Sequence, residues 1–347
     1  MLLPYISREY VMKYLVCGYL GYDNLGDELM ADAISSSLFK NDKEAIVEFF
    51  TPRNKKYGSF GCVNRHSPIK ILKSIKSCDV FILGGGTLIS EEASKRSAWY
   101  YTAVFLMSGM MKKRRLIWSC GIDRISSKAL KRVLKKQLPS ARISLRDTAS
   151  LDALWNIAVC KDARIHADPV FLLAGTKDRE KDLVRDILVV CIKSDAPKDL
   201  AVMIGSFCKK HSLTPVFAAT SPKDMSECEH QSALINARSI LLRDIDSAKS
   251  LFERSVLCLS MRYHAILLAA CFGCIPLSMS DSEKIISLMT EMELGDLILF
   301  GKYCYEKYEN ALDNTLKNSS AYQDICQKSV KKMLRRAELA EAYLLDL

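Results

Sequence analysis

The chain has 347 residues, of which 49% are hydrophobic and 26% charged, and its formal net charge is +10. This balance excludes a mainly disordered chain. A single core rarely exceeds about 250–300 residues, so the length favours two domains. The thirteen cysteines are scattered singly, and residues 1–11 lack the basic-then-apolar pattern of a secretion signal. We therefore expect a cytoplasmic protein with reduced thiols.

The excess positive charge is concentrated in runs at 112–115, 131–136 and 331–336. Most such runs are solvated helix faces. The functional interpretations are an anionic small substrate, or peripheral contact with the cytoplasmic face of a membrane. No nucleic-acid-binding motif occurs, so we expect no nucleic-acid partner.

In the first half, short apolar runs alternate with helical periodicity. The runs lie at 14–17, 46–50, 80–83, 116–120 and 143–145, with helices predicted at 27–39, 69–77 and 126–138. This alternation predicts a parallel sheet with helices on both faces. We assign residues 1–11 to an N-terminal extension and 12–178 to a first Rossmann-like domain.

The pattern restarts after a polar segment, with apolar runs at 187–192, 215–219, 255–260 and 275–278. We assign 179–318 to a second Rossmann-like domain. Residues 319–347 are predicted to form one long amphipathic helix packing back on the body, its apolar face formed by Val330, Met333, Leu334, Leu339 and Tyr343. The predicted fold is α/β, with two Rossmann-like domains facing a cleft in which ligands bind at strand ends.

Two glycine-rich segments follow predicted strands. In the segment 18–28, Gly21 lets backbone N–H groups approach a ligand, and a helix N-terminus favours an anion. The structural alternative is a tight turn capped by Asn24 or Asp27. In the segment 84–87, the glycines indicate a backbone that passes close to a ligand or to a neighbouring helix.

Basic residues and a histidine follow three other predicted strands. Arg146 is suited to hold a carboxylate or phosphate bidentately, or alternatively pairs with Asp147 or Asp168. His264 is suited to acid–base chemistry, although a lone histidine at a helix start is more often a capping or core residue. The adjacent Arg262 favours a functional role, and Lys284 offers a further cation at the same rim.

The Cys271–Cys274 pair has the spacing of a redox motif, but it lies at the end of an apolar helix. Two buried small hydrophobes are the better interpretation. The remaining histidines have no ligand-like spacing, so we predict no metal site.

Taken in order, five segments resemble the polysaccharide pyruvyl transferase family. They are GYLGYDNLGDE at 18–28, GGGTL at 84–88, SLRD at 144–147, ADPVF at 167–171 and SMRYHA at 260–265. The resemblance implies a fold similar to that of the GT-B glycosyltransferases. It also implies phosphoenolpyruvate as donor, a sugar acceptor in a cell-surface polysaccharide or its lipid-linked precursor, a cyclic ketal product, and no cofactor. On the same resemblance, the domain 12–178 is the acceptor side and the domain 179–318 is the donor side.

The resemblance makes Arg146, His264 and Lys284 donor-site residues, with Arg262 beside them. His264 would protonate the methylene carbon of the donor, and Asp23 or Asp27 would orient or deprotonate the acceptor hydroxyls. Further contacts to the acceptor or its loop would come from Gly21, Asn24, Gly85, Gly86 and Thr87. The segment Gly121–Arg124 departs from the family, where a Gly-Pro-type turn is frequent.

Two other functions fit the same architecture. One is a glycosyltransferase that uses a nucleotide sugar, and the other is a non-catalytic protein that binds a sugar or phosphate. Fold alone does not separate them from pyruvyl transfer.

Overall fold

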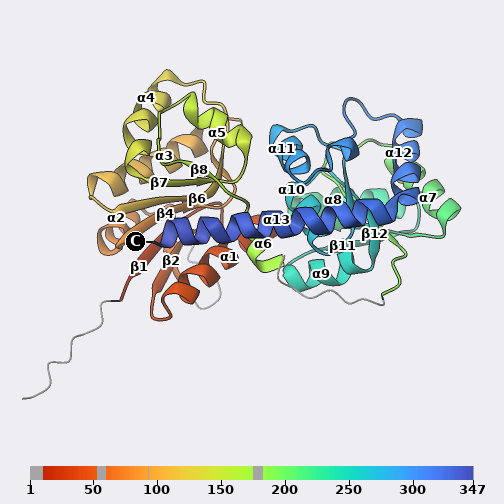
Figure 1. Cartoon of the computed structure of the whole chain (residues 1–347), viewed down its shortest axis with the longest axis horizontal. Coiled ribbons are helices and arrows are strands. Elements are labelled where there is room, and N and C mark those ends of the chain that lie inside the picture. Colours follow the sequence, from red (N-terminus) through yellow and green to blue (C-terminus); the bar gives the residue numbers. More distant parts are fainter. Residues whose placement is uncertain (1–10, 53–59, 93, 175–182, 347) are drawn as a thin grey trace, which may run out of the picture.

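The computed structural model describes residues 11–52, 60–92, 94–174 and 183–346, and these form two α/β units, each built on a parallel sheet (Figure 1). The strands of the N-terminal unit are β1 (Lys13–Cys17), β2 (Ile46–Thr51), β3 (Gly61–Asn64), β4 (Val80–Gly84), β5 (Thr87–Ile89), β6 (Arg114–Ile122), β7 (Arg142–Leu145) and β8 (Arg164–Ile165). Their order in the sheet is β3-β2-β1-β4-β6-β7-β8, and β5 pairs with β6.

Helices cover both faces of this sheet, as the alternating pattern predicts. One face is covered by α1 (Leu25–Asn41), which buries Ile34 and Leu38. The other face packs against α2 (Pro68–Ser77), α3 (Lys95–Met110), α4 (Lys128–Gln137) and α5 (Thr148–Trp155). A short 3₁₀ turn, η1 (Leu138–Ser140), follows α4.

The C-terminal unit contains β9 (Ile187–Cys191), β10 (Thr214–Ala219), β11 (Arg238–Leu241), β12 (Ser255–Ser260) and β13 (Ile275–Ser278), in the parallel order β11-β10-β9-β12-β13. Its helices are α7 (Leu200–His211), α8 (Pro222–Ala233), α9 (Ile245–Glu253), α10 (Tyr263–Cys271), α11 (Glu283–Glu291) and α12 (Tyr305–Lys317), with a 3₁₀ turn η2 (Gly295–Leu297). The short helix α6 (Val170–Ala174) lies between the two sheets in the sequence.

The last helix, α13 (Ser319–Leu345), runs along both units (Figure 1). The Ser329 hydroxyl donates to the Met292 carbonyl of the C-terminal unit at 2.6 Å. At the other end Leu344 lies in the core of the N-terminal unit, and Arg142 donates to the Tyr343 carbonyl at 3.1 Å. The long C-terminal helix is therefore confirmed, and it ties the two units together.

One detail of the predicted apolar face of α13 is wrong, because Leu339 is 60% exposed. The buried positions are Val330, Met333, Ala337, Ala340 and Leu344. Their spacing of three and four residues is that of one helix face. Two of these positions are alanines, which are only weakly hydrophobic. A prediction from hydrophobic periodicity therefore selects the neighbouring Leu339 instead.

The start of α1 joins the two units. Leu25, Leu29 and Met30 belong to the hydrophobic core of the C-terminal unit, and the Leu25 N–H donates to the Thr220 carbonyl at 2.9 Å. The first turn of α1 therefore lies at the junction of the units. The expected boundary at 178/179 and nearly all of the expected extension 1–11 fall outside the described residues, so the domain division stays a prediction.

Candidate active site

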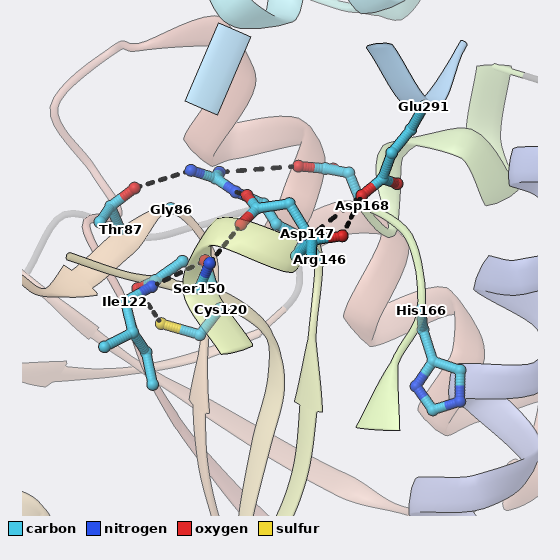
Figure 2. Close-up of polar contacts among 12 residues, drawn as sticks. Gly86, Thr87, Cys120, Ile122, Arg146, Asp147, Ser150, His166, Asp168 and Glu291 are labelled. Carbon is cyan, nitrogen blue, oxygen red and sulfur yellow. Dashed lines mark hydrogen bonds and ion pairs between the residues drawn. The ribbon is translucent and has the colours of Figure 1, made fainter. Parts of the chain in front are cut away.

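Arg146 follows β7 and is buried at the junction. Its Nη2 donates to Thr87 Oγ1 at 2.7 Å and its Nε donates to Asp147 Oδ2 at 3.2 Å, while Nη1 lies 3.9 Å from Asp168 Oδ2 (Figure 2). The guanidinium also stacks over the Tyr263 ring, 4.6 Å from its centroid. Burial by itself would lower the pKa of Arg146, but Tyr263, Asp147 and Asp168 together raise it, so the guanidinium stays charged. Both ion pairs of the structural interpretation are therefore present.

Asp147 accepts hydrogen bonds both from the first turn of α5 and from Arg146. As the N-cap of α5 its Oδ1 accepts from the Ser150 N–H at 2.7 Å, while its Oδ2 accepts from Arg146. A side-chain acceptor at this position satisfies one of the unpaired N–H groups of the first helical turn. The same aspartate thus fixes the guanidinium relative to α5.

His264 lies in the first turn of α10, and its side chain crosses to the N-terminal unit. Its Nε2 is 3.6 Å from Asp168 Oδ2, and both atoms are buried without a hydrogen bond to any described residue. An ideal Cβ at Gly26 would lie 1.8 Å from His264 Nδ1. Gly26 therefore leaves the space that the imidazole occupies against α1.

Asp27 is buried in the first turn of α1. Loss of hydration raises its pKa to about 6, although His264, Arg146 and Lys284 each act in the opposite direction. Burial disfavours the charged carboxylate more than these cations favour it. A carboxyl that titrates near neutral pH beside a histidine is suited to exchange protons with a ligand.

The loop before α1 is held by Glu28. Its Oε1 accepts from the Gly21 N–H at 2.9 Å and from the Asp23 N–H at 3.2 Å, and both residues have positive φ, 79° and 58°. Asn24 is the N-cap of α1, but its side chain makes no capping hydrogen bond. Asp23 is exposed on this loop, whereas Asp27 is buried at the junction.

The second glycine-rich segment passes close to α1. Gly85 and Gly86 have φ of 90° and 68°, and the Gly86 N–H lies 3.1 Å from Met30 Sδ. An ideal Cβ at Gly86 would lie 2.9 Å from Asp27 Oδ1. This close approach of backbone to helix, together with positive φ, accounts for the glycines structurally. At Gly121 a Cβ would lie 2.8 Å from Arg146 Nη2, so that glycine makes room for the arginine.

Three further cations come from the C-terminal unit. Arg262, after β12, forms an ion pair with Asp224 of α8. Loss of hydration, followed by the charges of Arg146 and Lys193, lowers the pKa of Lys284 in α11. Loss of hydration and Arg262 likewise lower the pKa of Lys193, which follows β9. Loss of hydration is the larger cause for both lysines, and the neighbouring cations add to it, so the four cations from the two units lie close enough to interact.

Lys193 and Lys284 make no ion pair in the part of the chain that the structure describes. The guanidinium groups of Arg146 and Arg262 are paired with carboxylates, so the two ammonium groups carry the excess positive charge, and an anion between them relieves their repulsion. Arg262 Nε is also buried with no hydrogen bond to a described residue. The cluster is therefore suited to bind an anionic ligand with more than one charged group.

The structure thus brings Asp27, Arg146, Arg262, His264 and Lys284 to one junction. Thr87 lies there as well, where it orients Arg146. Sequence reasoning missed Lys193, Asp224 and the carboxylate of Asp168 as a neighbour of His264. Lys193 directly follows the predicted strand at 187–192, so the signal that identified Arg146 and Arg262 also applies to it.

The described residues contain neither a cluster of metal ligands nor a membrane-spanning helix. Among the described residues, no group of three or more His, Cys, Asp or Glu side chains is placed to hold a metal ion. All thirteen cysteines are free thiols. No helix within the described ranges is both long and apolar enough to cross a membrane.

The fold is shared by solved structures of very different sequence. The UDP-GlcNAc 2-epimerase of Neisseria meningitidis superimposes with a TM-score of 0.68 at 11% identity, over 97% of this chain and 100% of that one. A glycosyltransferase of Rickettsia africae gives 0.62 at 10% identity, over 97% and 100%. MurG of Acinetobacter baumannii gives 0.56 at 11%, also over 97% and 100%. The chain therefore has the GT-B architecture of two Rossmann-like domains.

The family of the chain is identified by its match to a sequence model of a protein family. The family model for polysaccharide pyruvyl transferase matches residues 24–280, a span that includes Asp27, Arg146, Arg262 and His264. The chain belongs to the polysaccharide pyruvyl transferase family, and it is an enzyme of that type. Comparison with curated protein sequences gives no match.

Proposed function

We propose that this enzyme transfers the pyruvyl group of phosphoenolpyruvate to two hydroxyls of a sugar in a cell-surface polysaccharide or its lipid-linked precursor. The observation that carries the proposal is the convergence of Arg146, Lys193, Arg262 and Lys284 beside His264. Phosphoenolpyruvate carries a carboxylate and a phosphate on one carbon. Several cations are needed to neutralise both groups, and charge-assisted hydrogen bonds to such groups are strong.

The four cations have different roles in this proposal. The Nε and Nη2 of Arg146 are engaged by Asp147 and Thr87, and its charge is partly offset by Asp147 and Asp168. Arg146 therefore contributes less to donor binding than the two lysines, which make no ion pair with a described residue. Lys193, Lys284 and the exposed part of Arg262 contact the donor. Binding of a multiply charged anion relieves the repulsion that lowers the pKa of both lysines.

His264 supplies the first proton. Protonation of the methylene carbon converts it to a methyl group and leaves the central carbon electrophilic. One sugar hydroxyl adds to that carbon and gives up its proton, and the bond from carbon to the phosphate oxygen breaks. A second hydroxyl then closes the ketal and also gives up its proton. One of these two protons replaces the proton that His264 delivered, and the other leaves with phosphate. The products are the cyclic ketal and inorganic phosphate, so atoms balance without an oxidant or reductant.

Asp27 is the better candidate than Asp23 for the acceptor base. Its pKa of about 6 leaves mostly carboxylate at neutral pH, and the exchange of its proton there costs little. Asp168, 3.6 Å from His264 Nε2, is positioned to pair with the imidazole when it is protonated. Asp168 therefore acts as a positioning residue for both His264 and Arg146.

Transfer in heavy water tests this chemistry. The enzyme, phosphoenolpyruvate and a polysaccharide or lipid-linked oligosaccharide fraction are incubated, and the product is analysed by NMR. The proposal predicts a ketal methyl group with one solvent deuteron and an equal amount of phosphate. A product that keeps the methylene group would show enolpyruvyl transfer without ketal formation. Consumption of a nucleotide sugar instead would favour the glycosyltransferase alternative.

A further inference from the structure

Three adjacent helices of the N-terminal unit carry positive charge without any negative charge. α2 has three basic residues, the segment from α3 to Arg115 has six, and α4 has five, which together exceed the net charge of the whole chain. No Asp or Glu occurs in 67–78, 94–122 or 127–146. Because most solvated surfaces mix both signs, this bias is unusual for a helix layer that only covers a sheet.

The three helices lie side by side on one face of the sheet. α3 packs against both α2 and α4, and all three bury residues in the same core. Hydrogen bonds from the segment after α3 hold the last turns of α2 and α4. Lys113 donates to the Lys76 carbonyl at 2.8 Å, and Arg115 donates to the Gln137 carbonyl at 3.1 Å. The three helices therefore present one continuous outer surface.

The outer positions of α3 are largely apolar. Trp99, Ala103 and Met110 are exposed at spacings of four and seven residues, opposite the buried positions Ala98 and Phe105. Trp99 is 40% exposed and Met110 is 75% exposed. α2 adds Ile69 and Leu72 at its outer positions, 68% and 41% exposed.

Cations flank this apolar stripe. On α2 the outer positions include Lys73 and Lys76, and on α4 they are Lys128, Arg132, Lys135 and Lys136, all exposed. We call these cations together with Ile69, Leu72, Trp99 and Met110 the α2–α3–α4 face. Exposed apolar residues within a basic surface, with tryptophan among them, are typical of segments that lie at a membrane interface.

We infer that the α2–α3–α4 face binds an anionic lipid surface. The cations are attracted to acidic headgroups, and the apolar side chains enter the interface between headgroups and acyl chains. Nucleic acid would be attracted by the same charge, but its phosphate backbone has no apolar surface against which Ile69, Leu72 and Met110 could be buried. The inference rests on residues other than those of the cation cluster in the active site, so it stands independently of the donor.

The orientation of these helices places the face beside the active site. In a parallel sheet the helices run opposite to the strands, so the first turns of α2 and α3 lie at the carboxyl edge where Thr87 and Arg146 are found. Ile69 is in the first turn of α2, and Trp99 directly follows the first turn of α3. A membrane bound at this face would therefore lie beside the edge at which a lipid-linked acceptor would be received.

Vesicle sedimentation tests the inference without phosphoenolpyruvate or acceptor. The full chain is mixed with vesicles of phosphatidylcholine alone, or with about one third phosphatidylglycerol. The test variant combines Lys73→Glu, Arg132→Glu and Lys136→Glu. The matched control combines Lys328→Glu, Lys331→Glu and Arg335→Glu, three exposed cations of α13, a helix that also carries acidic residues. Thermal unfolding of each variant checks that it is folded.

We expect wild type and the α13 variant to sediment with anionic vesicles, and neither with neutral ones. Each basic residue near an anionic membrane raises the binding affinity roughly fivefold. The triple variant on the α2–α3–α4 face should therefore bind anionic vesicles at least about a hundredfold more weakly than wild type. Trp99→Ser should weaken binding with no change in charge. Equal binding by both triple variants would overturn the inference, as would wild-type binding to an oligonucleotide but not to vesicles.

Discussion

The fit of His264 against Gly26 gives a sharp prediction for the substitution Gly26→Ala. The new methyl group would lie 1.8 Å from Nδ1, 2.3 Å from Cγ and 2.4 Å from Cε1 of the imidazole. Ordinary contact is about 3.5 Å, so the ring must move by well over 1 Å. Overpacking of this kind costs about 1–3 kcal/mol. A displacement of about 1 Å at a reacting group can lower turnover about 10²-fold.

A double-mutant cycle separates this clash from a general effect on α1. His264→Ala removes the ring, so Gly26→Ala in that background should be neutral or slightly stabilising, because alanine favours a helix over glycine by about 1 kcal/mol. The control is Gly295→Ala, where the nearest atom to the new Cβ is 3.9 Å away. The assay is the thermal midpoint, at about 2–4 °C per kcal/mol. Equal destabilisation by Gly26→Ala in both backgrounds would refute the reasoning.

Two further predictions concern the charges of the site. Because burial raises the pKa of Asp27 from 3.8 to about 6, the folded chain binds more protons than the unfolded chain between these values. The stability contributed by protonated Asp27 is therefore complete below about pH 4 and is lost as the pH rises through 6, by about 2–3 kcal/mol. The unfolding midpoint of wild type should fall relative to that of Asp27→Asn over this range, and parallel curves would contradict the assignment; Asp324→Asn is an exposed control. Lys193→Ala should weaken phosphoenolpyruvate binding by about 10- to 100-fold, as expected for a lost charge-assisted hydrogen bond, whereas exposed Lys198→Ala in the same loop should not. Equal calorimetric affinities for the two lysine variants would remove Lys193 from the donor site.

Much of the fold could be predicted because the strong apolar runs are buried strands. The runs at 80–83, 116–120, 187–192 and 255–260 all correspond to central strands, whose side chains are buried on both faces. The short strands β3, β5, β8 and β11 were not predicted. β3, β8 and β11 lie at sheet edges, where half-exposed residues give weak periodicity.

The candidate site was predictable in part, for a related reason. Arg146, Arg262 and His264 follow strong strands and stand in ordered motifs, so local sequence identifies them. The contacts of His264 with Asp168 and of Arg262 with Asp224 join segments far apart in the chain, and only the packing of the two units defines them. The role of Gly26 could not be predicted from local sequence either, because the space that it leaves is occupied by His264, 238 residues later in the chain.

The most direct test of the proposed activity is the thermal stability of the purified chain with phosphoenolpyruvate, compared with UDP- and GDP-sugars. A ligand present at about 100 times its dissociation constant adds about 2.7 kcal/mol, a shift of several degrees. We predict that phosphoenolpyruvate alone stabilises the chain, and that Arg262→Ala abolishes the shift while exposed Arg238→Ala on β11 retains it. Stabilisation by a nucleotide sugar and not by phosphoenolpyruvate would contradict the proposed donor.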